Sequence, residues 1–128
     1  MKILAEISVG ELFDKIAILD LKLEHIGEPE KRAHVERERA ALASTMRREI
    51  PPSAELDELA VQLKSVNAAL WRVEDELRRC EREGRFDAEF VALARSVYQT
   101  NDQRARLKHA INQLTNSEIV EQKSYEAY

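Results

Sequence analysis

A heptad repeat between residues 56 and 80 constrains the fold of this 128-residue chain more than any other feature. Its apolar positions recur at alternating steps of three and four: Leu56, Leu59, Leu63, Val66, Leu70, Val73, Leu77 and Cys80. This spacing is typical of a long helix whose apolar face packs nearly parallel to a second helix. The chain must therefore supply a partner helix of comparable length.

Residues 88–116 are the predicted partner of the heptad helix. The heptad helix is expected to cover 54–83, because Ser53 can cap its start and Gly84 can end it. Asp87 can cap the next helix. Since the link between the two is so short, they should form an antiparallel hairpin roughly 45 Å long, at about 1.5 Å per residue.

A third helix is predicted over residues 9–26. Ser8 and Glu11 have the spacing of a capping box, in which each side chain binds the backbone amide of the other residue. The apolar residues that follow recur at steps of three and four, and further apolar residues widen the stripe. We expect this helix to be mostly buried.

The fourth helix is predicted over residues 29–50. Gly27 is expected to end the preceding helix in a left-handed conformation, and Pro29 can occupy the first helical position, where a missing amide costs least. Few apolar side chains interrupt its charged residues, so it should act as a solvated cover.

These elements predict an all-α fold and a single domain over residues 1–128. Three glycines and three prolines leave too few turn formers for a sandwich or barrel of many short strands. We expect an antiparallel up-and-down four-helix bundle built on the long helical hairpin, with short extended segments at the N- and C-termini.

Composition and charge exclude several functions. A formal net charge of −4 argues against nucleic-acid binding, which usually needs a basic face. Cys80 is the single cysteine, so no internal disulfide framework or multi-cysteine zinc site is expected. Charged residues interrupt every apolar run, which argues against a signal peptide or membrane anchor, and the lone cysteine favours a cytoplasmic location. No motif indicates a cofactor, and the histidines lack the partners of a metal site.

Three rows of polar side chains run along the predicted helices at helical spacing. They are Glu11, Lys15, Lys22 and His25; Asn67, Trp71, Glu74 and Arg78; and Asn101, Arg104, Lys108 and Asn112. If the helices bring these rows together, they frame a cleft of amides, cations and one indole. Such a cleft suits an anionic or sugar-like ligand, such as a phosphorylated sugar or a nucleotide. The candidate binding residues are Lys15, Lys22, Asn67, Trp71, Glu74, Asn101 and Arg104.

A structural interpretation of the same rows stays open. Long helices carry polar flanks as a rule, and Glu74 with Arg78 has the spacing of an ordinary surface ion pair. Asn67 and Asn101 can bond each other across the hairpin and fix its register. Adjacent Glu74 and Asp75 diverge by about 100° on a helix, so they cannot act as a facing acid–base pair. Whether the protein is an enzyme stays undecided at this point.

Three segments, residues 7–26, 66–78 and 93–108, resemble a family of short bacterial helical proteins without an established activity. The resemblance covers nearly the whole chain. Strings within the first two segments also resemble, more distantly, a second such family, in which they occur in the opposite order. Members of these groups tend to be associated with glycosyltransferases of surface-polysaccharide assembly.

The resemblance implies a set of motif positions that largely coincides with the polar rows. They are Asp14, Lys15, Lys22, His25, Asn67, Trp71, Glu74, Asp75, Arg78, Asn101 and Arg104. We therefore expect a shared polar cluster, which is either a ligand site or a buried hydrogen-bond network. The favoured function is a non-catalytic accessory or interaction protein of surface-glycan assembly that binds a protein partner or its own copy. The alternative is a binding or enzymatic pocket for a phosphorylated sugar or nucleotide.

Overall fold

The computed structural model describes residues 1–128 and contains four helices and no strand. These are α1 (Val9–His25), α2 (Pro29–Glu49), α3 (Ala54–Glu83) and α4 (Ala88–Thr115). The predicted all-α four-helix class is confirmed. Three predicted helices extended one residue too far, because Ile26, Ile50 and Asn116 are C-caps rather than helical residues.

The predicted start signals act as expected. The side chains of Ser8, Ser53 and Asp87 each accept a hydrogen bond from the backbone N–H three residues further on, at 3.0, 3.1 and 3.1 Å respectively. These bonds satisfy amides that have no partner inside the helix. Gly84 ends α3 in the left-handed conformation with φ of 65°, as the sequence predicts.

The prediction for the end of α1 was wrong. Gly27 does not adopt a positive φ, and the chain leaves the helix through Ile26 in an extended conformation. The guanidinium of Arg32 donates hydrogen bonds to the carbonyl oxygens of Leu23 and Ile26 instead. The last carbonyl oxygens of a helix have no partner within it, and a left-handed glycine often lets later backbone amides bind them. Here a side chain of α2 binds them instead.

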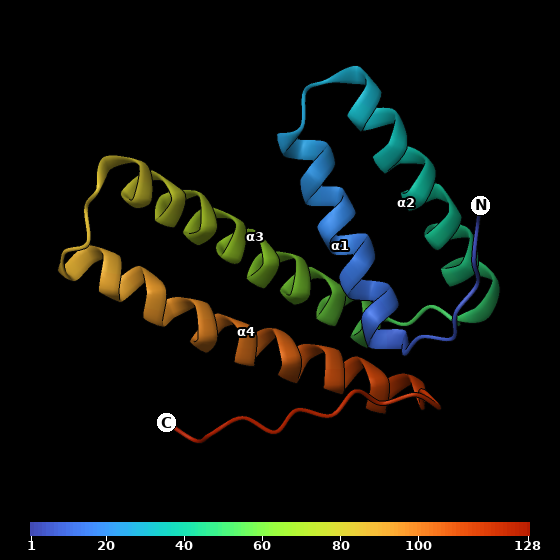
Figure 1. The fold of residues 1–128 in the computed structure, drawn as a ribbon. Coiled ribbons are helices and arrows are strands. Elements are labelled where there is room, and N and C mark those ends of the chain that lie inside the picture. Colours follow the sequence, from blue (N-terminus) through green and yellow to red (C-terminus); the bar gives the residue numbers. More distant parts are fainter.

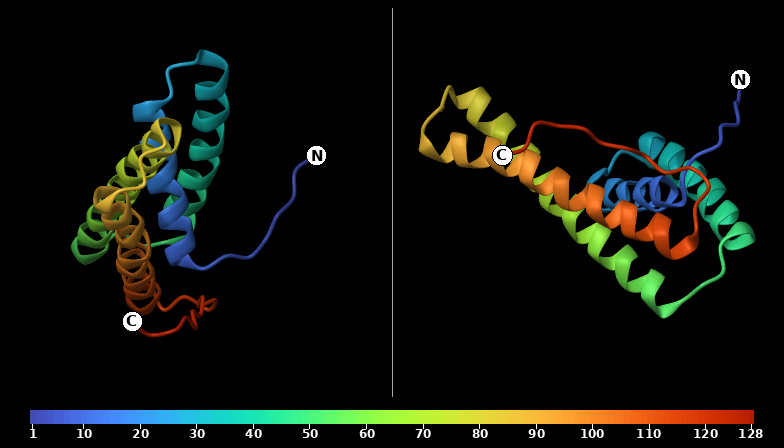
Figure 2. Two further views of the ribbon diagram at one scale, coloured as in Figure 1. Left: turned by 60° about the vertical axis from the view of Figure 1, so that its left-hand side comes forward. Right: turned by 90° about the horizontal axis from the view of Figure 1, so that it is seen from below.

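The four helices form two antiparallel hairpins, α1–α2 and α3–α4, which meet at one end of the molecule and diverge toward their turns (Figure 1). Helix α1 lies against all three other helices, whereas the backbone of α2 neighbours α1 alone. The bundle is therefore open between α2 and α3. The two further views show the N-terminal segment projecting away from the helices, and the C-terminal segment running back beside α4 (Figure 2).

The hydrophobic core lies at the end where the hairpins meet. Phe13 of α1, Leu56 and Leu63 of α3, and Ile111 of α4 form a buried cluster. Side chains from the end of α2 also pack on this cluster, so all four helices contribute. Exclusion of these apolar side chains from water is the main force that holds the hairpins together.

The part of the α3–α4 hairpin beyond α1 has little core of its own. Between Asn67 and Ile111 the only buried residue is Cys80, on the heptad face of α3. We call residues 71–100, which include the turn, the distal hairpin. No helix of the protein combines the length and apolar content that crossing a membrane requires.

Candidate functional site

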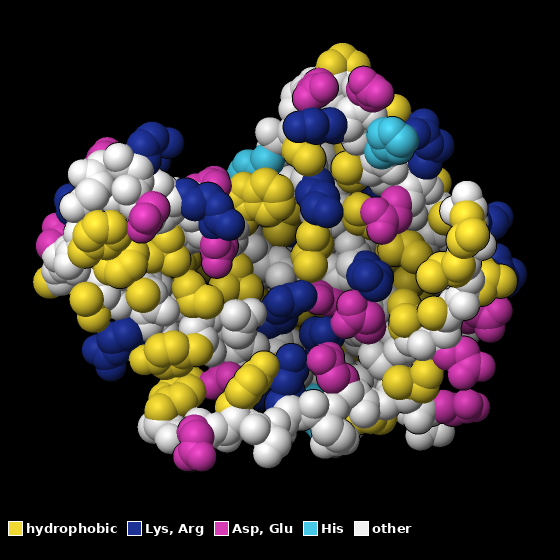
Figure 3. All heavy atoms as spheres, viewed as in Figure 1, with side chains coloured by type: hydrophobic (Ala, Val, Ile, Leu, Met, Phe, Trp, Pro, Cys, Tyr) yellow, Lys and Arg dark blue, Asp and Glu magenta, His cyan; other side chains and the backbone are white.

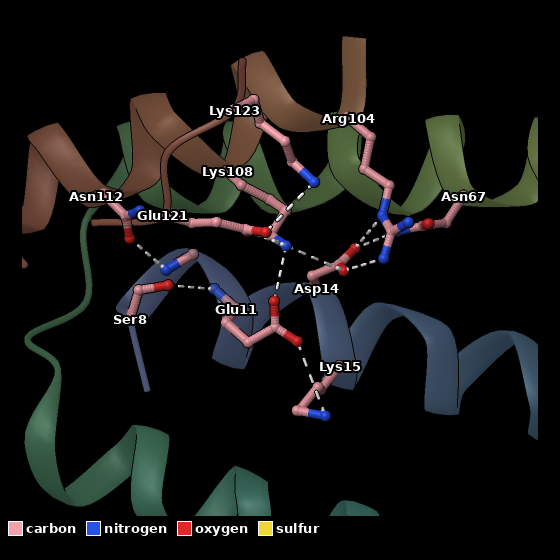
Figure 4. Close-up of polar contacts among 11 residues, drawn as sticks. Ser8, Glu11, Asp14, Lys15, Asn67, Arg104, Lys108, Asn112, Glu121 and Lys123 are labelled. Carbon is pink, nitrogen blue, oxygen red and sulfur yellow. Dashed lines mark hydrogen bonds and ion pairs between the residues drawn. The ribbon is translucent and has the colours of Figure 1, made fainter. Parts of the chain in front are cut away.

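Three of the motif residues, Asp14, Asn67 and Arg104, meet where α1 crosses the α3–α4 hairpin (Figure 4). Asp14 is 1% exposed although it carries a formal charge. It lies in the apolar stripe of α1, so the helix that buries Leu12 and Phe13 also carries this carboxylate inside. A buried charge is tolerated only when other groups satisfy it.

Side chains from α3 and α4 satisfy Asp14. Nε of Arg104 donates to Oδ1 of Asp14 at 3.0 Å, and a second guanidinium nitrogen donates to Oδ2, so the pair is bidentate. Nδ2 of Asn67 donates to the same Oδ1 at 2.8 Å. Nζ of Lys108 lies 3.7 Å from Oδ2. One carboxylate thus binds three helices together.

The surroundings of Asp14 keep it charged. Burial alone would raise the pKa of Asp14, but hydrogen bonds from Arg104 and Asn67 and the charges of Arg104 and Lys108 outweigh burial, so its pKa lies below its ordinary value. The hydrogen bond to Asp14 raises the pKa of Arg104 in turn. At neutral pH the network is an ion pair, and neither group is poised to exchange a proton.

Lys108 extends the network to the C-terminal segment. Its Nζ donates to the carboxylates of Glu11 at 2.7 Å and Glu121 at 3.1 Å. Burial alone would lower the pKa of Lys108, but these two carboxylates outweigh burial and raise it. Because Glu11 binds Lys108, its carboxylate does not return to the amide of Ser8. The second half of the predicted capping box was therefore wrong.

The start of α1 is fixed to the end of α4 by backbone contacts. The amide of Gly10 donates to Oδ1 of the buried Asn112 at 2.7 Å, and the amide of Val9 donates to Oγ of Ser117 at 3.1 Å. A Cβ atom at Gly10 would lie 2.5 Å from the carbonyl oxygen of Lys108. The two helices approach this closely only because residue 10 has no side chain.

Beside the network lies a groove of about 500 Å³ between α1, α3 and α4. Five of the seven predicted binding residues line it, together with two further motif positions and three aliphatic side chains of α1 and α3. The lining is Ile18, Leu21, Asn67, Leu70, Trp71, Glu74, Asp75, Arg78, Asn101 and Arg104. The sequence rows on α3 and α4 therefore converge as predicted.

The other two predicted residues do not line the groove. Lys15 is exposed on α1 and lies 3.8 Å from the carboxylate of Glu11 (Figure 4). Lys22 is half-buried on the same helix, outside the groove lining. The predicted bond between Asn67 and Asn101 also does not form, because Asn67 donates to Asp14.

Trp71 is the largest side chain of the groove. Its ring stacks on the imidazole of His25, with 4.6 Å between the ring centroids and 13° between the planes. The contact fixes the far end of α1 on α3 and covers one face of the indole. Trp71 is half-buried, so part of the ring stays accessible in the groove.

The cations of the groove are already engaged. Arg104 binds Asp14, and the guanidinium of Arg78 binds the carboxylate of Glu74 one turn away. Asp75 is exposed and forms no ion pair. The charge of Arg104 is neutralised by Asp14 and that of Arg78 by Glu74, so the carboxylate of Asp75 leaves the groove with a net negative charge. Nowhere does the structure gather three or more His, Cys, Asp or Glu residues that could hold a metal ion.

Sequence reasoning missed Gly10 and Glu121 as parts of the site, and it left Lys108 and Asn112, which belong to the predicted polar row on α4, out of the candidate binding residues. Asp14 had a signal of its own, since it is the one charge inside an apolar stripe, at helical spacing from Ile18 and Leu21. Lys108 and Asn112 continue the row of Arg104 along α4. The role of Gly10 needs the crossing of α1 and α4 to be known.

Comparison with curated proteins and with solved structures finds no match for this chain. A family model matches residues 1–128, the whole length of the chain. The protein belongs to the family of unknown function DUF6165.

Proposed function

We propose that the protein is a non-catalytic interaction protein that binds a protein partner through the groove around Trp71 and the adjoining distal hairpin. One observation carries the proposal: the cations of the groove are bound to carboxylates, while apolar side chains of the distal hairpin are left exposed. In this proposal the network around Asp14 has a structural role: it holds α1, α3 and α4 together and so positions the groove.

The charge of the groove disfavours a phosphorylated ligand. A phosphate group carries about 1.5 to 2 negative charges at neutral pH and needs free cations or amides to bind it. Here both guanidinium groups are committed, and the carboxylates of Glu74 and Asp75 line the groove. Lys15 and Lys22, the two predicted cations on α1, lie outside it. A partner with an apolar side chain next to a lysine or arginine fits this lining better.

The distal hairpin supports the same function. Phe86, Val91 and Tyr98 are 55%, 51% and 43% exposed, and only Cys80 is buried in this stretch. Hydrophobic side chains gather on the part of the surface that the α3–α4 hairpin occupies, toward its turn (Figure 3). Exposed apolar patches of this kind mark interaction sites, and a partner that covers them would supply the burial that this stretch lacks.

Affinity capture with matched variants tests the proposal. Trp71→Ala and Asp75→Arg alter the groove, whereas Arg72→Ala changes an exposed neighbour on the same helix and serves as the control. A true partner is retained by the wild type and the control and is lost with both groove variants. The purified partner should change the fluorescence of Trp71, the single tryptophan, and bind Asp75→Arg at least tenfold more weakly.

The predicted alternative, a pocket for a phosphorylated sugar or nucleotide, is the competing outcome. It requires that nucleotide-sugars change the Trp71 fluorescence and that Arg104→Ala abolishes the change. That result would contradict the proposal. A role in surface-glycan assembly rests on the family resemblance, and a cytoplasmic location rests on the composition; both stay predictions.

A further inference from the structure

The first seven residues form an apolar segment that contacts no other part of the protein through a hydrogen bond. Ile3 and Leu4 are 80% and 95% exposed, and Met1 and Ile7 are exposed as well. Four exposed apolar side chains in seven residues are costly in water unless something covers them. We call residues 1–7 the N-terminal arm.

The N-terminal arm has one wholly apolar side if it is extended. Side chains alternate between the two sides of an extended chain, so Met1, Ile3, Ala5 and Ile7 lie on one side. Lys2, Leu4 and Glu6 lie on the other side, and neither of the two charged residues forms an ion pair within the chain. One side of the arm is therefore suited to an apolar cleft, and the other can interact with charges at its rim.

A cleft with matching properties lies in the open angle between α1, α2 and α3. It has a volume of about 490 Å³, and eight of its fourteen lining residues are hydrophobic. Phe13 and Ile16 of α1, Met46 of α2, and Leu56 and Val61 of α3 are among them. Val61 is 66% exposed, whereas Phe13, Ile16 and Leu56 are already buried, so Val61 is the exposed apolar side chain that the cleft offers.

The charged rim of the cleft complements the arm. Asp20 binds Arg39 and Lys64 binds Glu24, so these four charges are paired within the chain. Arg47 and Asp57 also line the cleft, are exposed and form no ion pair. The cleft thus offers one free cation and one free carboxylate, and the arm offers one of each, Glu6 and Lys2.

The direction of the arm points to a second copy rather than to the same chain. Val9 and Gly10, directly after the arm, are held against α4 by their backbone amides. From this fixed point the arm projects away from the helices (Figure 2). Seven extended residues span roughly 23 Å, which is enough to lie along a cleft in a neighbouring molecule.

We propose that the N-terminal arm of each chain binds in the α1–α2–α3 cleft of a second copy, so that two chains form a symmetric dimer by reciprocal arm exchange. In each contact the arm of one chain binds the cleft of the other, so the two surfaces that meet are different. The two contacts are related by a twofold axis. This surface is separate from the groove around Trp71 and from the distal hairpin. The dimer leaves those surfaces free for the partner of the proposed function.

Sedimentation velocity across a concentration series tests the exchange. We expect a dimer for the wild type and a monomer, or at least a hundredfold higher dissociation constant, for Ile3→Asp in the arm and for Val61→Asp in the cleft. Both residues are largely exposed, so neither change should prevent folding. Val91→Asp, on the equally apolar distal hairpin, is the control and should leave the dimer intact.

Mixing the two variants gives the sharper test. The Val61→Asp chain keeps an intact arm and the Ile3→Asp chain keeps an intact cleft, so an equimolar mixture should form a heterodimer through one contact. A monomeric wild type would overturn the proposal. So would a dimer that survives both changes, a mixture that stays monomeric, or a dimer lost only in Val91→Asp, which would assign dimer formation to the distal hairpin.

Discussion

The guanidinium of Arg104 binds both carboxylate oxygens of Asp14, although the two residues are 90 positions apart in the sequence. Asp14 is almost fully buried on α1, and Arg104 reaches it from α4. Asn67 of α3 donates a further hydrogen bond to the same carboxylate. Arg104 and Asn67, which the sequence predicts as binding residues, thus hold three helices together through the carboxylate of Asp14.

The stability of the protein should depend on the charge of Asp14. Because its pKa is lowered in the folded state, the carboxylate contributes stability at neutral pH. That contribution is fully present above the ordinary pKa of about 3.8 and is lost as the pH falls through the lower pKa of the folded protein. In Asp14→Asn the free energy of unfolding should be lower at pH 7 and should fall less on acidification.

Urea unfolding between about pH 7 and pH 2 measures this difference. Glu118→Gln is the control, because Glu118 is exposed and forms no ion pair. Equal acid sensitivity in the wild type and Asp14→Asn would show that the buried carboxylate does not contribute.

Gly10→Ala should destabilise the protein by roughly 1–3 kcal/mol, because the new methyl group meets a backbone carbonyl that cannot move aside. Its Cβ atom would lie 2.5 Å from the carbonyl oxygen of Lys108 and 3.0 Å from Oδ1 of Asn112. Gly27→Ala is the matched control, since no atom lies within 4 Å of its Cβ position. Thermal or urea unfolding of the two variants gives the comparison. Equal stabilities would mean that α1 and α4 are not this close.

His25→Ala should uncover the indole of Trp71. The two rings stack with centroids 4.6 Å apart, so removing the imidazole exposes one face of the indole to water. We expect the tryptophan emission to shift to longer wavelength and the free energy of unfolding to fall by about 0.5–1.5 kcal/mol. His109→Ala, an exposed histidine on α4, should change neither quantity. An unchanged emission maximum in His25→Ala would rule out the stack.

Much of the fold could be predicted because it depends on local chemistry. The hydroxyl of Ser53 and the carboxylate of Asp87 cap the helices that follow them, and Gly84 ends α3, as their positions indicate. The heptad repeat predicts that α3 needs a long partner, and α4 is that partner. The caps and the end of α3 are fixed by residues within a few positions of one another, and the heptad repeat lies within a single helix.

The site could be predicted more fully on α3 and α4 than on α1, where Glu11 and His25 contact it but Lys15 and Lys22 do not line the groove. The row that includes Lys15 and Lys22 has helical spacing, yet the side of α1 that faces the hairpin carries Asp14, Ile18 and Leu21. These rows differ by one residue, which rotates a side chain by about 100° on a helix. Spacing alone cannot choose between them, since the choice depends on how α1 crosses the hairpin.

The end of α1 is a second feature that local sequence alone does not predict. A glycine two residues after a helix is often its left-handed end, and Gly27 has that position. The carbonyls it would have helped to pair are bound by Arg32 of the next helix. A tertiary contact can thus replace a local end signal.

The central claim, that the polar cluster binds the helices together and leaves the groove to a protein partner, is tested most directly by the free energy of unfolding of Arg104→Ala at pH 7. Loss of the guanidinium would leave the buried carboxylate of Asp14 without its main partner. We predict a loss of roughly 2–4 kcal/mol in urea unfolding. A loss below about 0.5 kcal/mol, together with a Trp71 fluorescence response to nucleotide-sugars that this variant lacks, would contradict the claim.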